Sequence, residues 1–289
     1  MTVINTNVNA LQATAASNAA ATMTSQAMTR LSTGKRINSA SDDAAGLAIA
    51  TSMTSQINGM NQGIKNANDG ISLAQTAEGS LTEVTNMLQR VRELAVQSAS
   101  GTYSSSDRDQ MQAEVTSLTG QIKNVLTSTT FNGVELFSTT SGSNLTFSIQ
   151  AGANHNAADV VSISSVGIDG TQLVSTLASG AGFQVSDTVS GDGTGIANAN
   201  TTIDNVDTVL KQVATVNANF GAGQSQLQSA VNNMTNNVTN LSAARSRIED
   251  TDYSAESTAM AKAQILSQAS TAMIAQANQS QQNVLTLLK

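Results

Sequence analysis

Few residues of this 289-residue chain have the types and spacing that metal binding would require. Asp42 and Asp43 stand side by side in the stretch NSASDDAAGLAIA, and neighbouring carboxylates can bind a divalent cation. No histidine or third acid follows them at ligand spacing. Helix capping, together with the attraction of carboxylates to a helix N-terminus, explains the pair better. We therefore expect no metal site and no cofactor.

Residues for covalent or acid–base catalysis are equally sparse. The only histidine is His155, and the chain has no cysteine. A hydrolase or redox enzyme needs a nucleophile beside a base, or a metal with its ligands. Neither the HExxH motif nor the GxxxxGK[ST] loop occurs, and no acid stands in an apolar stretch that would raise its pKa. The sequence predicts no catalytic residue and no enzyme.

The charge distribution excludes a nucleic-acid partner. No Lys or Arg occurs between Lys123 and Lys211, whereas nucleic acid needs a basic face. Seven acids fall in this stretch and form either a solvated, mutually repelling surface or a cation site: Glu135, Asp159, Asp169, Asp187, Asp192, Asp204 and Asp207. We see no signal peptide and no apolar run of roughly 20 residues, so we expect no membrane insertion.

Long helices dominate the first half of the chain. Apolar residues recur at helical spacing over 1–33, although half of them are alanine, and Gly34 ends the pattern. From about 43 to 100 the gaps are three or four throughout, as in a coiled-coil seam about 85 Å long. This seam comprises Ile57, Met60, Ile64, Ala67, Ile71, Ala74, Ala77, Leu81, Val84, Leu88, Val91 and Ala95. A second helix after Asp107 should fold back antiparallel on the first.

The pattern then changes to strands and later returns to helix. FNGVELF (131–137) carries an Asn-Gly hairpin signal, and LTFSI (145–149) and VVSISSVGI (160–168) are strand candidates. Helix resumes near 201, with a local disturbance expected at Gly221 and Gly223, and a final helix follows a break at 248–253.

These elements predict a mainly α, rod-shaped, antiparallel coiled-coil or helical bundle with paired N- and C-terminal helices. A small β-hairpin-rich part and a short loop-rich surface insert complete it. The predicted domains are an inner coiled coil (1–42 with 253–289), an outer helical core with β-hairpins (43–150 with 201–252) and a variable, solvent-facing insert (151–200).

Several long blocks of the sequence resemble bacterial flagellin. They include RLSTGKRINSASDDAAGLAIA (30–50), LQRVRELAVQSASGT (88–102), SAARSRIEDTDY (242–253) and QNVLTLLK (282–289), in the order of that family. The resemblance covers about the first 137 and last 85 residues. It implies a subunit that polymerises into the extracellular flagellar filament for swimming motility and is exported without a cleaved signal peptide.

The resemblance also implies where partners bind. The terminal coiled coil and its polymerisation contacts would use Ile4, Val8, Leu11, Leu31, Leu266, Met273, Val284, Leu287 and Leu288. The segment that the animal Toll-like flagellin receptor recognises would include Gln89, Arg90, Leu94 and Glu114. The tail held by the flagellar export chaperone would include Ile265, Leu266, Met273, Val284 and Leu287. The terminal helices would fold only on assembly, since two isolated weak helices should not hold together in water.

Other readings stay open beside the filament subunit. A hook–filament junction protein shares the terminal patterns, and both junction and filament cap proteins would be partners of a filament subunit. A surface or polysaccharide-binding role of 140–200 is a further alternative, although sugar sites usually stack on aromatic rings and few lie there. Ser and Thr in 138–202 could instead carry O-linked sugars.

Overall fold

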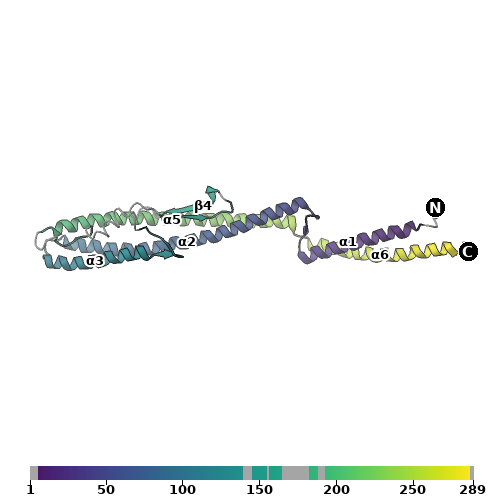
Figure 1. Cartoon of the computed structure of the whole chain (residues 1–289), viewed down its shortest axis with the longest axis horizontal. Helices are drawn as coiled ribbons and strands as arrows, with labels where there is room; N and C mark the ends of the chain where they lie inside the picture. The colour runs from purple at the N-terminus through teal and green to yellow at the C-terminus, as the bar shows by residue number, and fades with distance from the viewer. Residues whose placement is uncertain (1–5, 139–144, 155, 165–181, 188–192, 287–289) are drawn as a thin grey trace. The chain divides into compact units, whose positions relative to one another are not determined.

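In the computed structural model, residues 6–138, 145–154, 156–164, 182–187 and 193–286 are described. Five long helices carry most of them: α1 (Val8–Thr33), α2 (Ala44–Ser98), α3 (Ser105–Ser128), α5 (Gly195–Glu249) and α6 (Tyr253–Thr286) (Figure 1). The chain divides into two compact units, Met1–Ile57 with Thr239–Lys289 (unit 1) and Asn58–Val238 (unit 2). The predicted mainly α class is confirmed, and no described helix combines the length and hydropathy of a membrane span.

Local capping sets where the first three helices begin. The side chain of Asn7 accepts a hydrogen bond from the amide of Ala10 at the start of α1, which ends at Gly34 with φ +69°. Asp43 accepts from the amide of Gly46 at the start of α2. At the start of α3, Ser104 and Asp107 form a reciprocal capping box. One of the two adjacent acids thus caps a helix, as the sequence predicts.

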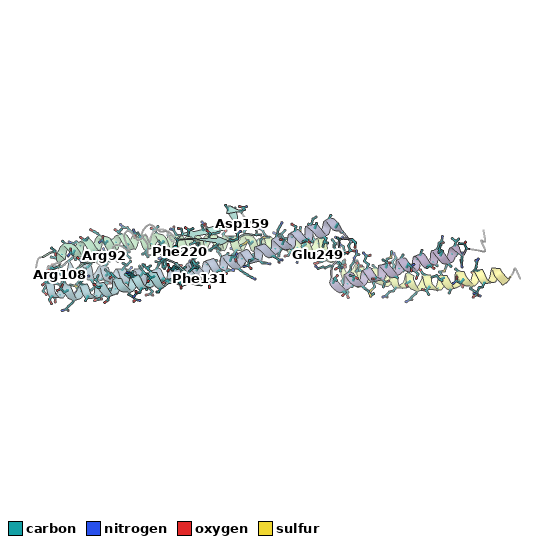
Figure 2. All side chains as sticks on the ribbon, in the orientation of Figure 1. Arg92, Arg108, Phe131, Asp159, Phe220 and Glu249 are labelled. Carbon is teal, nitrogen blue, oxygen red and sulfur yellow. The ribbon has the colours of Figure 1, made fainter. Side chains whose placement is uncertain are left out.

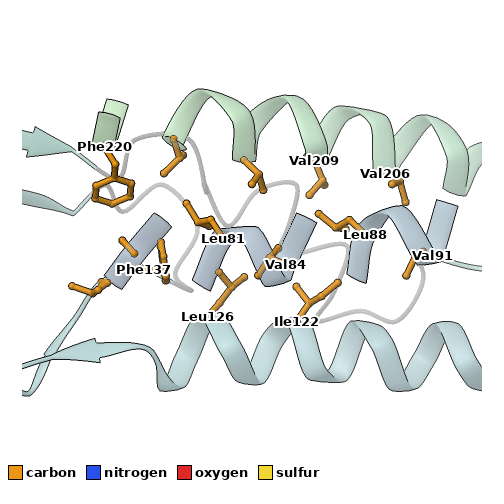
Figure 3. Close-up of a cluster of buried hydrophobic side chains, with 14 of the residues drawn as sticks. Leu81, Val84, Leu88, Val91, Ile122, Leu126, Phe137, Val206, Val209 and Phe220 are labelled. Atoms are coloured by element: carbon orange, nitrogen blue, oxygen red, sulfur yellow. The ribbon is translucent and has the colours of Figure 1, made fainter. Parts of the chain in front are cut away.

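The core of unit 2 lies where α2 packs between α3 and α5 (Figure 3). From Ala67 onward the seam predicted along α2 is almost fully buried, with Leu81, Val84 and Leu88 at 0% exposure. Figure 3 shows Ile122 and Leu126 of α3 on one side of it and Val206 and Val209 of α5 on the other. The seam and its coiled-coil spacing are confirmed.

Ion pairs and hydrogen bonds set the helix directions in unit 2. Arg92 of α2 pairs with Asp207 of α5 at 2.7 Å, whereas Glu78, earlier on α2, accepts from Gln224, later on α5. The two helices therefore run antiparallel. In Figure 3 residue numbers rise along α2 from Leu81 to Val91, whereas in the same direction they fall along α3 from Leu126 to Ile122. Helix α3 therefore runs antiparallel to α2, which confirms the predicted return.

Two small hairpins complete unit 2. Strands β1 (Thr130–Phe131) and β2 (Val134–Glu135) are joined by Asn132 and Gly133, both with positive φ, as an Asn-Gly hairpin turn requires. Strands β3 (Thr146–Gln150) and β4 (Val160–Ser164) pair antiparallel, and the short 3₁₀ helix η1 (Ala157–Asp159) lies between them. Each of the three strand regions expected from the sequence contains a strand, and residues 165–168 of the third lie outside the described residues.

Glycines on the long helices let the β3–β4 hairpin approach closely. A Cβ at Gly59 would lie 2.8 Å from the Cβ of Ala153, and one at Gly223 of α5 would lie 2.7 Å from Ile163. Figure 2 shows the side chains around this region, with Asp159 at the turn and Phe220 on α5. The hairpin is therefore seated on the helices by small residues.

Helix α5 differs from the sequence prediction in two ways. It begins at Gly195 rather than near 201, because Ala199 (0%) and Thr202 (1%) are buried and tertiary packing stabilises the first turns. It is also unbroken at Gly221 and Gly223, so the expected disturbance is wrong. Gly223 instead provides room for Ile163 within a continuous helix.

Candidate functional site

The terminal helices α1 and α6 pair antiparallel within unit 1 (Figure 1). Near one end of the pair, Nδ2 of Asn7 donates to the carbonyl of Ala277 at 3.1 Å. Near the other end, Arg30 lies 3.7 Å from the carboxylate of Glu256. The paired terminal helices predicted from the sequence are confirmed.

Small residues make up the contact between α1 and α6. Among the side chains of the pair that the structure describes, the buried ones are Ala20 and Ala27 at 2%, Ala263 at 1% and Ser270 at 8% exposure. Each such side chain removes little apolar area from water, so its burial stabilises the pair only weakly. The helix pair therefore has little hydrophobic stabilisation of its own.

The large apolar residues of the two helices point outward. Leu11 is 70% exposed, Ile265 66% and Met273 61%. We group the exposed large apolar side chains of the two helices under the name terminal apolar face: Val8, Leu11, Met23, Met28, Ile265, Leu266 and Met273. Leu266 and Met273 among them line a hollow of about 370 Å³ beside Gln12, Ala13 and Ala16 of α1. Soluble monomers rarely leave so many large apolar side chains exposed on two neighbouring helices, and such surfaces mark contacts with other molecules.

Most residues predicted for the terminal coiled coil fall on these helices. Val8, Leu11, Leu266 and Met273 belong to the terminal apolar face, and Leu31 is half-buried. Val284 lies in α6, but its side chain is outside the description. Ile4, Leu287 and Leu288 lie outside the described residues.

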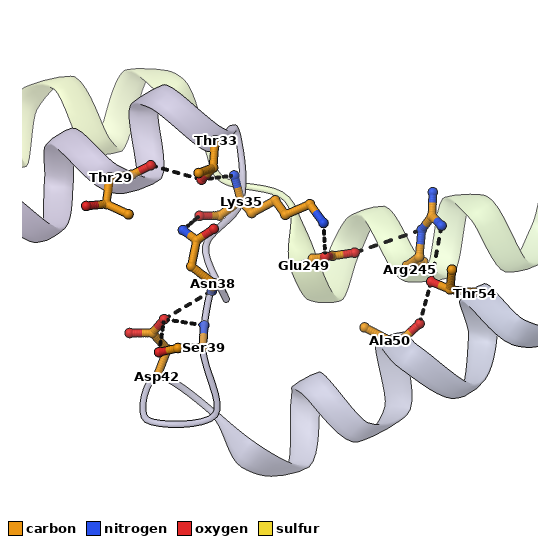
Figure 4. Close-up of polar contacts among 10 residues, drawn as sticks. All are labelled: Thr29, Thr33, Lys35, Asn38, Ser39, Asp42, Ala50, Thr54, Arg245 and Glu249. Carbon is orange, nitrogen blue, oxygen red and sulfur yellow. Dashed lines mark hydrogen bonds and ion pairs between the residues drawn. The ribbon is translucent and has the colours of Figure 1, made fainter.

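A cluster of polar contacts joins the chain breaks at the ends of α1 and α5 (Figure 4). Nζ of Lys35 lies 2.5 Å from Oε1 of Glu249, and Arg245 reaches both Glu249 and the hydroxyl of Thr54. Backbone contacts reinforce it, because the amide of Arg36 donates to the carbonyl of Glu249 at 2.6 Å. We call this cluster, Lys35, Arg36, Thr54, Arg245 and Glu249, the clasp.

The loop beside the clasp is held by Asp42. Its Oδ2 accepts hydrogen bonds from the amides of Asn38 and Ser39, both at 3.0 Å (Figure 4). These backbone bonds are the main reason that the pKa of Asp42 is lowered. The adjacent acids thus serve the loop and the helix cap, and the described residues contain no group of three His, Cys, Asp or Glu placed to bind a metal.

The predicted receptor segment forms one face across α2 and α3. Nε of Arg90 lies 2.8 Å from Oε1 of Glu114 and its Nη1 lies 3.1 Å from Glu93. Hydrogen bonds to these two carboxylates, Glu114 first, raise the pKa of Arg90. Gln89 is exposed, whereas Leu94 is only 2% exposed and lines the floor of a hollow of about 450 Å³ beside Arg90 and Glu114.

The sequence reasoning missed the clasp. Lys35 and Glu249 are far apart in the chain, and nothing in hydrophobic periodicity pairs them. The one available signal was that both stand beside a helix break, at Gly34 and at 248–253. Charged residues of opposite sign at two breaks of an antiparallel pair are candidates for contact.

Family models match both ends of the chain. "Bacterial flagellin N-terminal helical region" matches residues 4–142, and "Bacterial flagellin C-terminal helical region" matches residues 203–288. Among curated proteins, the chain is 36% identical to "Flagellin B" of Vibrio cholerae over 374 aligned residues, covering 99% of each chain. It is 42% identical to "Flagellin" of Bacillus subtilis over 282 residues, covering 91% of each.

One solved structure adds a likeness of fold. A putative flagellar hook-associated protein from Vibrio parahaemolyticus aligns with a TM-score of 0.56 at 16% identity, covering 72% of this chain and 100% of that one. The crystal structure of Bacillus cereus flagellin aligns with a TM-score of 0.46 at 28% identity, covering 63% of this chain and 94% of that one.

Proposed function

The chain belongs to the bacterial flagellin family, and from this premise we propose how its surfaces serve the flagellar filament. As a flagellin it is a structural subunit of the filament used for swimming, outside the cell, and it is not an enzyme. The residue-level roles that follow are our proposals.

The terminal apolar face is the main contact between copies of the chain. The observation that carries this proposal is the outward direction of Leu11, Ile265 and Met273 on helices that bury only small residues between them. In a helical polymer each subunit uses two different surfaces, so neighbouring copies can cover these side chains. We assign Val284, Leu287 and Leu288, apolar residues that follow in the sequence, to the same contact.

The terminal helices become stable only on assembly. The α1–α6 pair has alanine and serine at its centre, so the free energy gained within one chain is small. Contacts with neighbouring copies supply the remaining burial, and folding of the two helices is thereby coupled to polymerisation. Such coupling would restrict filament growth to sites where neighbouring subunits are already assembled.

Seeded polymerisation followed by electron microscopy tests the contact. Purified chain is added to short filament fragments, beside the variants Leu11→Asp and Met273→Asp and a chain that lacks 278–289. We expect long filaments from the unaltered chain and none from the three altered chains. Ser117→Asp, which adds the same charge at an exposed position of α3, should still polymerise.

Two outcomes would count against this assignment. If Leu11→Asp and Met273→Asp grew filaments at the unaltered rate, the terminal apolar face would not be the contact. If the unaltered chain only capped the seeds without growth, a hook–filament junction protein would be the better reading.

We assign the export chaperone to the same helix α6. Ile265, Leu266 and Met273 offer it exposed apolar side chains before assembly, and we assign the apolar residues Val284 and Leu287, which follow in the sequence, to the same partner. Because the chaperone and the neighbouring subunits would use the same side chains, their binding should be mutually exclusive. Pre-bound chaperone should therefore stop seeded growth, and excess seeds should not displace it from Leu11→Asp, which keeps the chaperone residues of α6 and alters only the filament contact.

For the animal Toll-like flagellin receptor we assign the face around Arg90. Gln89, Arg90 and Glu114 are exposed and joined by the Arg90–Glu114 ion pair, while Leu94 forms the floor between α2 and α3. Arg90→Ala should weaken receptor signalling by the free monomer. Unchanged signalling by Arg90→Ala would contradict the receptor assignment, and the proposed filament contact would be unaffected by that result.

The remaining partners follow from the place of a filament subunit in the flagellum. The junction protein and the cap protein would contact the two ends of the polymer, and export would proceed without removal of a signal peptide. An intact mass of the assembled subunit that equals the mass of the unmodified chain would support this export route. The same measurement would show whether Ser and Thr in 138–202 carry sugars.

A further inference from the structure

Residues 182–187, with the sequence GFQVSD, pack against α2, α3 and α5 of unit 2 and are bound there largely through their backbone; we use the word groove for the helix side chains that surround them. We call these residues the strap. The groove is formed by side chains of α2, α3 and α5. Five consecutive carbonyl groups of the strap, from Gly182 to Ser186, each accept a hydrogen bond from one of these helix side chains.

The even-numbered carbonyls all bond to α5. Donors on α5 stand at positions 198, 202 and 205, spaced so that they share one helix face. The pairs are Asn205 with Gly182 at 2.7 Å, Thr202 with Gln184 at 2.7 Å and Asn198 with Ser186 at 2.9 Å. The numbers rise along the strap as they fall along α5, so the strap runs antiparallel to this helix.

The spacing of alternate carbonyls along the strap matches the spacing of the donors along α5. Two residues of extended chain advance about 6.6 Å, and three or four helical residues advance about 4.5–6 Å. Every second carbonyl of the strap therefore meets a donor on the same face of α5. Nothing in this match depends on the side chains of the strap.

The odd-numbered residues of the strap form hydrogen bonds with side chains of α2 and α3 instead of α5. The amide side chain of Gln112 on α3 donates to the carbonyl of Phe183 at 3.1 Å and accepts from the amide of Val185 at 2.6 Å. The hydroxyl of Ser98 on α2 donates to the carbonyl of Val185. Gln112 thus binds the strap with both of its polar atoms.

Side chains of the strap add selectivity. Phe183 is 3% and Val185 0% exposed, whereas the residues between and after them are partly exposed. At the end of the strap, Oδ1 of Asp187 accepts from the amide of Gly195 at the start of α5. The groove therefore selects an extended segment of the pattern apolar, any residue, apolar, any residue, acid.

We propose that this groove is a recognition site for an extended peptide, and that its ligand is the sequence of residues 182–187. In this structure the ligand is tethered to the same chain. Because the helices contribute side chains to it, the backbone hydrogen bonds within α2, α3 and the later turns of α5 do not depend on the strap. A free peptide of the same sequence can therefore occupy the groove once the tethered copy is released.

The test uses the full chain with the two anchors removed, Phe183→Ala/Val185→Ala, and a synthetic peptide GFQVSD with blocked ends. Binding is followed by the NMR signals of the side-chain amides of Gln112, Asn198 and Asn205. We expect saturable shifts in the released variant. The unaltered chain should resist the peptide up to the effective concentration of its tether, on the order of millimolar.

Matched controls decide whether the peptide uses the groove. Adding Gln112→Ala to the released variant should weaken peptide binding about tenfold or more, since two hydrogen bonds to the peptide backbone are lost. A peptide with serine in place of the phenylalanine should bind poorly. Absence of binding to a folded released variant, or binding that survives Gln112→Ala, would overturn the proposal.

A second measurement tests the proposal in the unaltered chain and applies even if the released variant does not fold. In the unaltered chain, hydrogen exchange at the Val185 amide should be faster than at core amides of α5 such as Val206, because the strap opens locally. Equal exchange at the two amides would mean that the strap leaves only when unit 2 unfolds. That result would also overturn the proposal.

Discussion

Nζ of Lys35 and Oε1 of Glu249 lie 2.5 Å apart, joining the break after α1 to the last residue of α5 (Figure 4). The carboxylate of Glu249 is only 12% exposed, and Arg245 lies 4.0 Å from its other oxygen. In such a largely buried cluster, loss of one charge is more costly than in a surface pair, because the remaining charges are left without a partner and poorly solvated. The clasp is therefore a specific contact between the two chain breaks of unit 1.

Glu249→Gln should loosen the clasp. The substitution keeps the shape of the side chain but removes its charge, and Lys35 and Arg245 lose their partner. We expect a loss on the order of 1 kcal/mol in local stability. Hydrogen exchange at the Arg36 and Thr251 amides, both donors to carbonyls of the clasp region, should become about fivefold faster.

A surface pair provides the control for the clasp. Glu93→Gln removes a carboxylate that is 68% exposed and pairs with Arg90 in unit 2. Exchange at Arg36 and Thr251 should not respond to it. Equal responses to both substitutions would show that a general change in charge, rather than the clasp, is being measured.

Acid should destabilise the chain through its bonded carboxylates. Hydrogen bonds from Arg92, and then its charge, lower the pKa of Asp207 in the folded chain. Hydrogen bonds lower the pKa of Asp42 and Asp107 in the same direction. A carboxyl whose folded pKa lies below its unfolded value stabilises the fold above the unfolded value, and this stability is lost as pH falls through the folded value.

The window for this acid effect lies below roughly pH 4, the ordinary range of an aspartate carboxyl. Urea unfolding followed by circular dichroism from pH 5 to pH 2 should show midpoints that fall with pH. Asp207→Asn should make that fall shallower. Asp204→Asn, on the same helix and without an ion pair among the described residues, should leave the slope unchanged, and a flat profile in the unaltered chain would contradict the prediction.

Hydrophobic spacing was sufficient to predict most of the fold. The seam of α2 recurs at three and four residues and is buried as expected, because in long helices the packing face follows directly from the period. Hydrophobic spacing did not predict the segments whose backbone is positioned by polar side chains. Asn198, Thr202 and Asn205 carry no hydrophobic signal, so neither the start of α5 at Gly195 nor the burial of Phe183 could be foreseen.

The outward direction of the terminal residues was also only partly predictable. The stripe containing Leu11 and Met23 has helical spacing, and the sequence alone suggests that it faces α6. In the structure Ala27 of the same stripe and the neighbouring Ala20 are buried, whereas Leu11 and Met23 are exposed. The spacing alone does not show which members of the stripe are buried, because in a close helix pair the small side chains make the contact.

Removal of the capping box should weaken the start of α3. In Ser104→Ala the amide of Asp107 loses its acceptor at 3.2 Å, and the Asp107 carboxylate loses the hydroxyl of Ser104. We expect unit 2 to lose about 1 kcal/mol, as for other N-cap substitutions. Ser106→Ala, at an exposed position in the same turn, should change the unfolding midpoint little, and similar losses in both variants would argue against the cap.

Two glycines of α2 should respond to alanine with opposite signs. Alanine stabilises an exposed helix position by roughly 0.5–1 kcal/mol relative to glycine. Gly79 has no atom within 4 Å of an added Cβ, so Gly79→Ala should show this gain in full.

At Gly59 the added Cβ would lie 2.8 Å from the Cβ and 3.2 Å from the Cα of Ala153. Since neither atom belongs to a flexible side chain, the β3–β4 hairpin must shift, at a cost of about 1–3 kcal/mol. Urea unfolding of unit 2 should therefore give a raised midpoint for Gly79→Ala and a lowered one for Gly59→Ala, whereas a rise in both would mean that the hairpin is not held against α2 at Gly59.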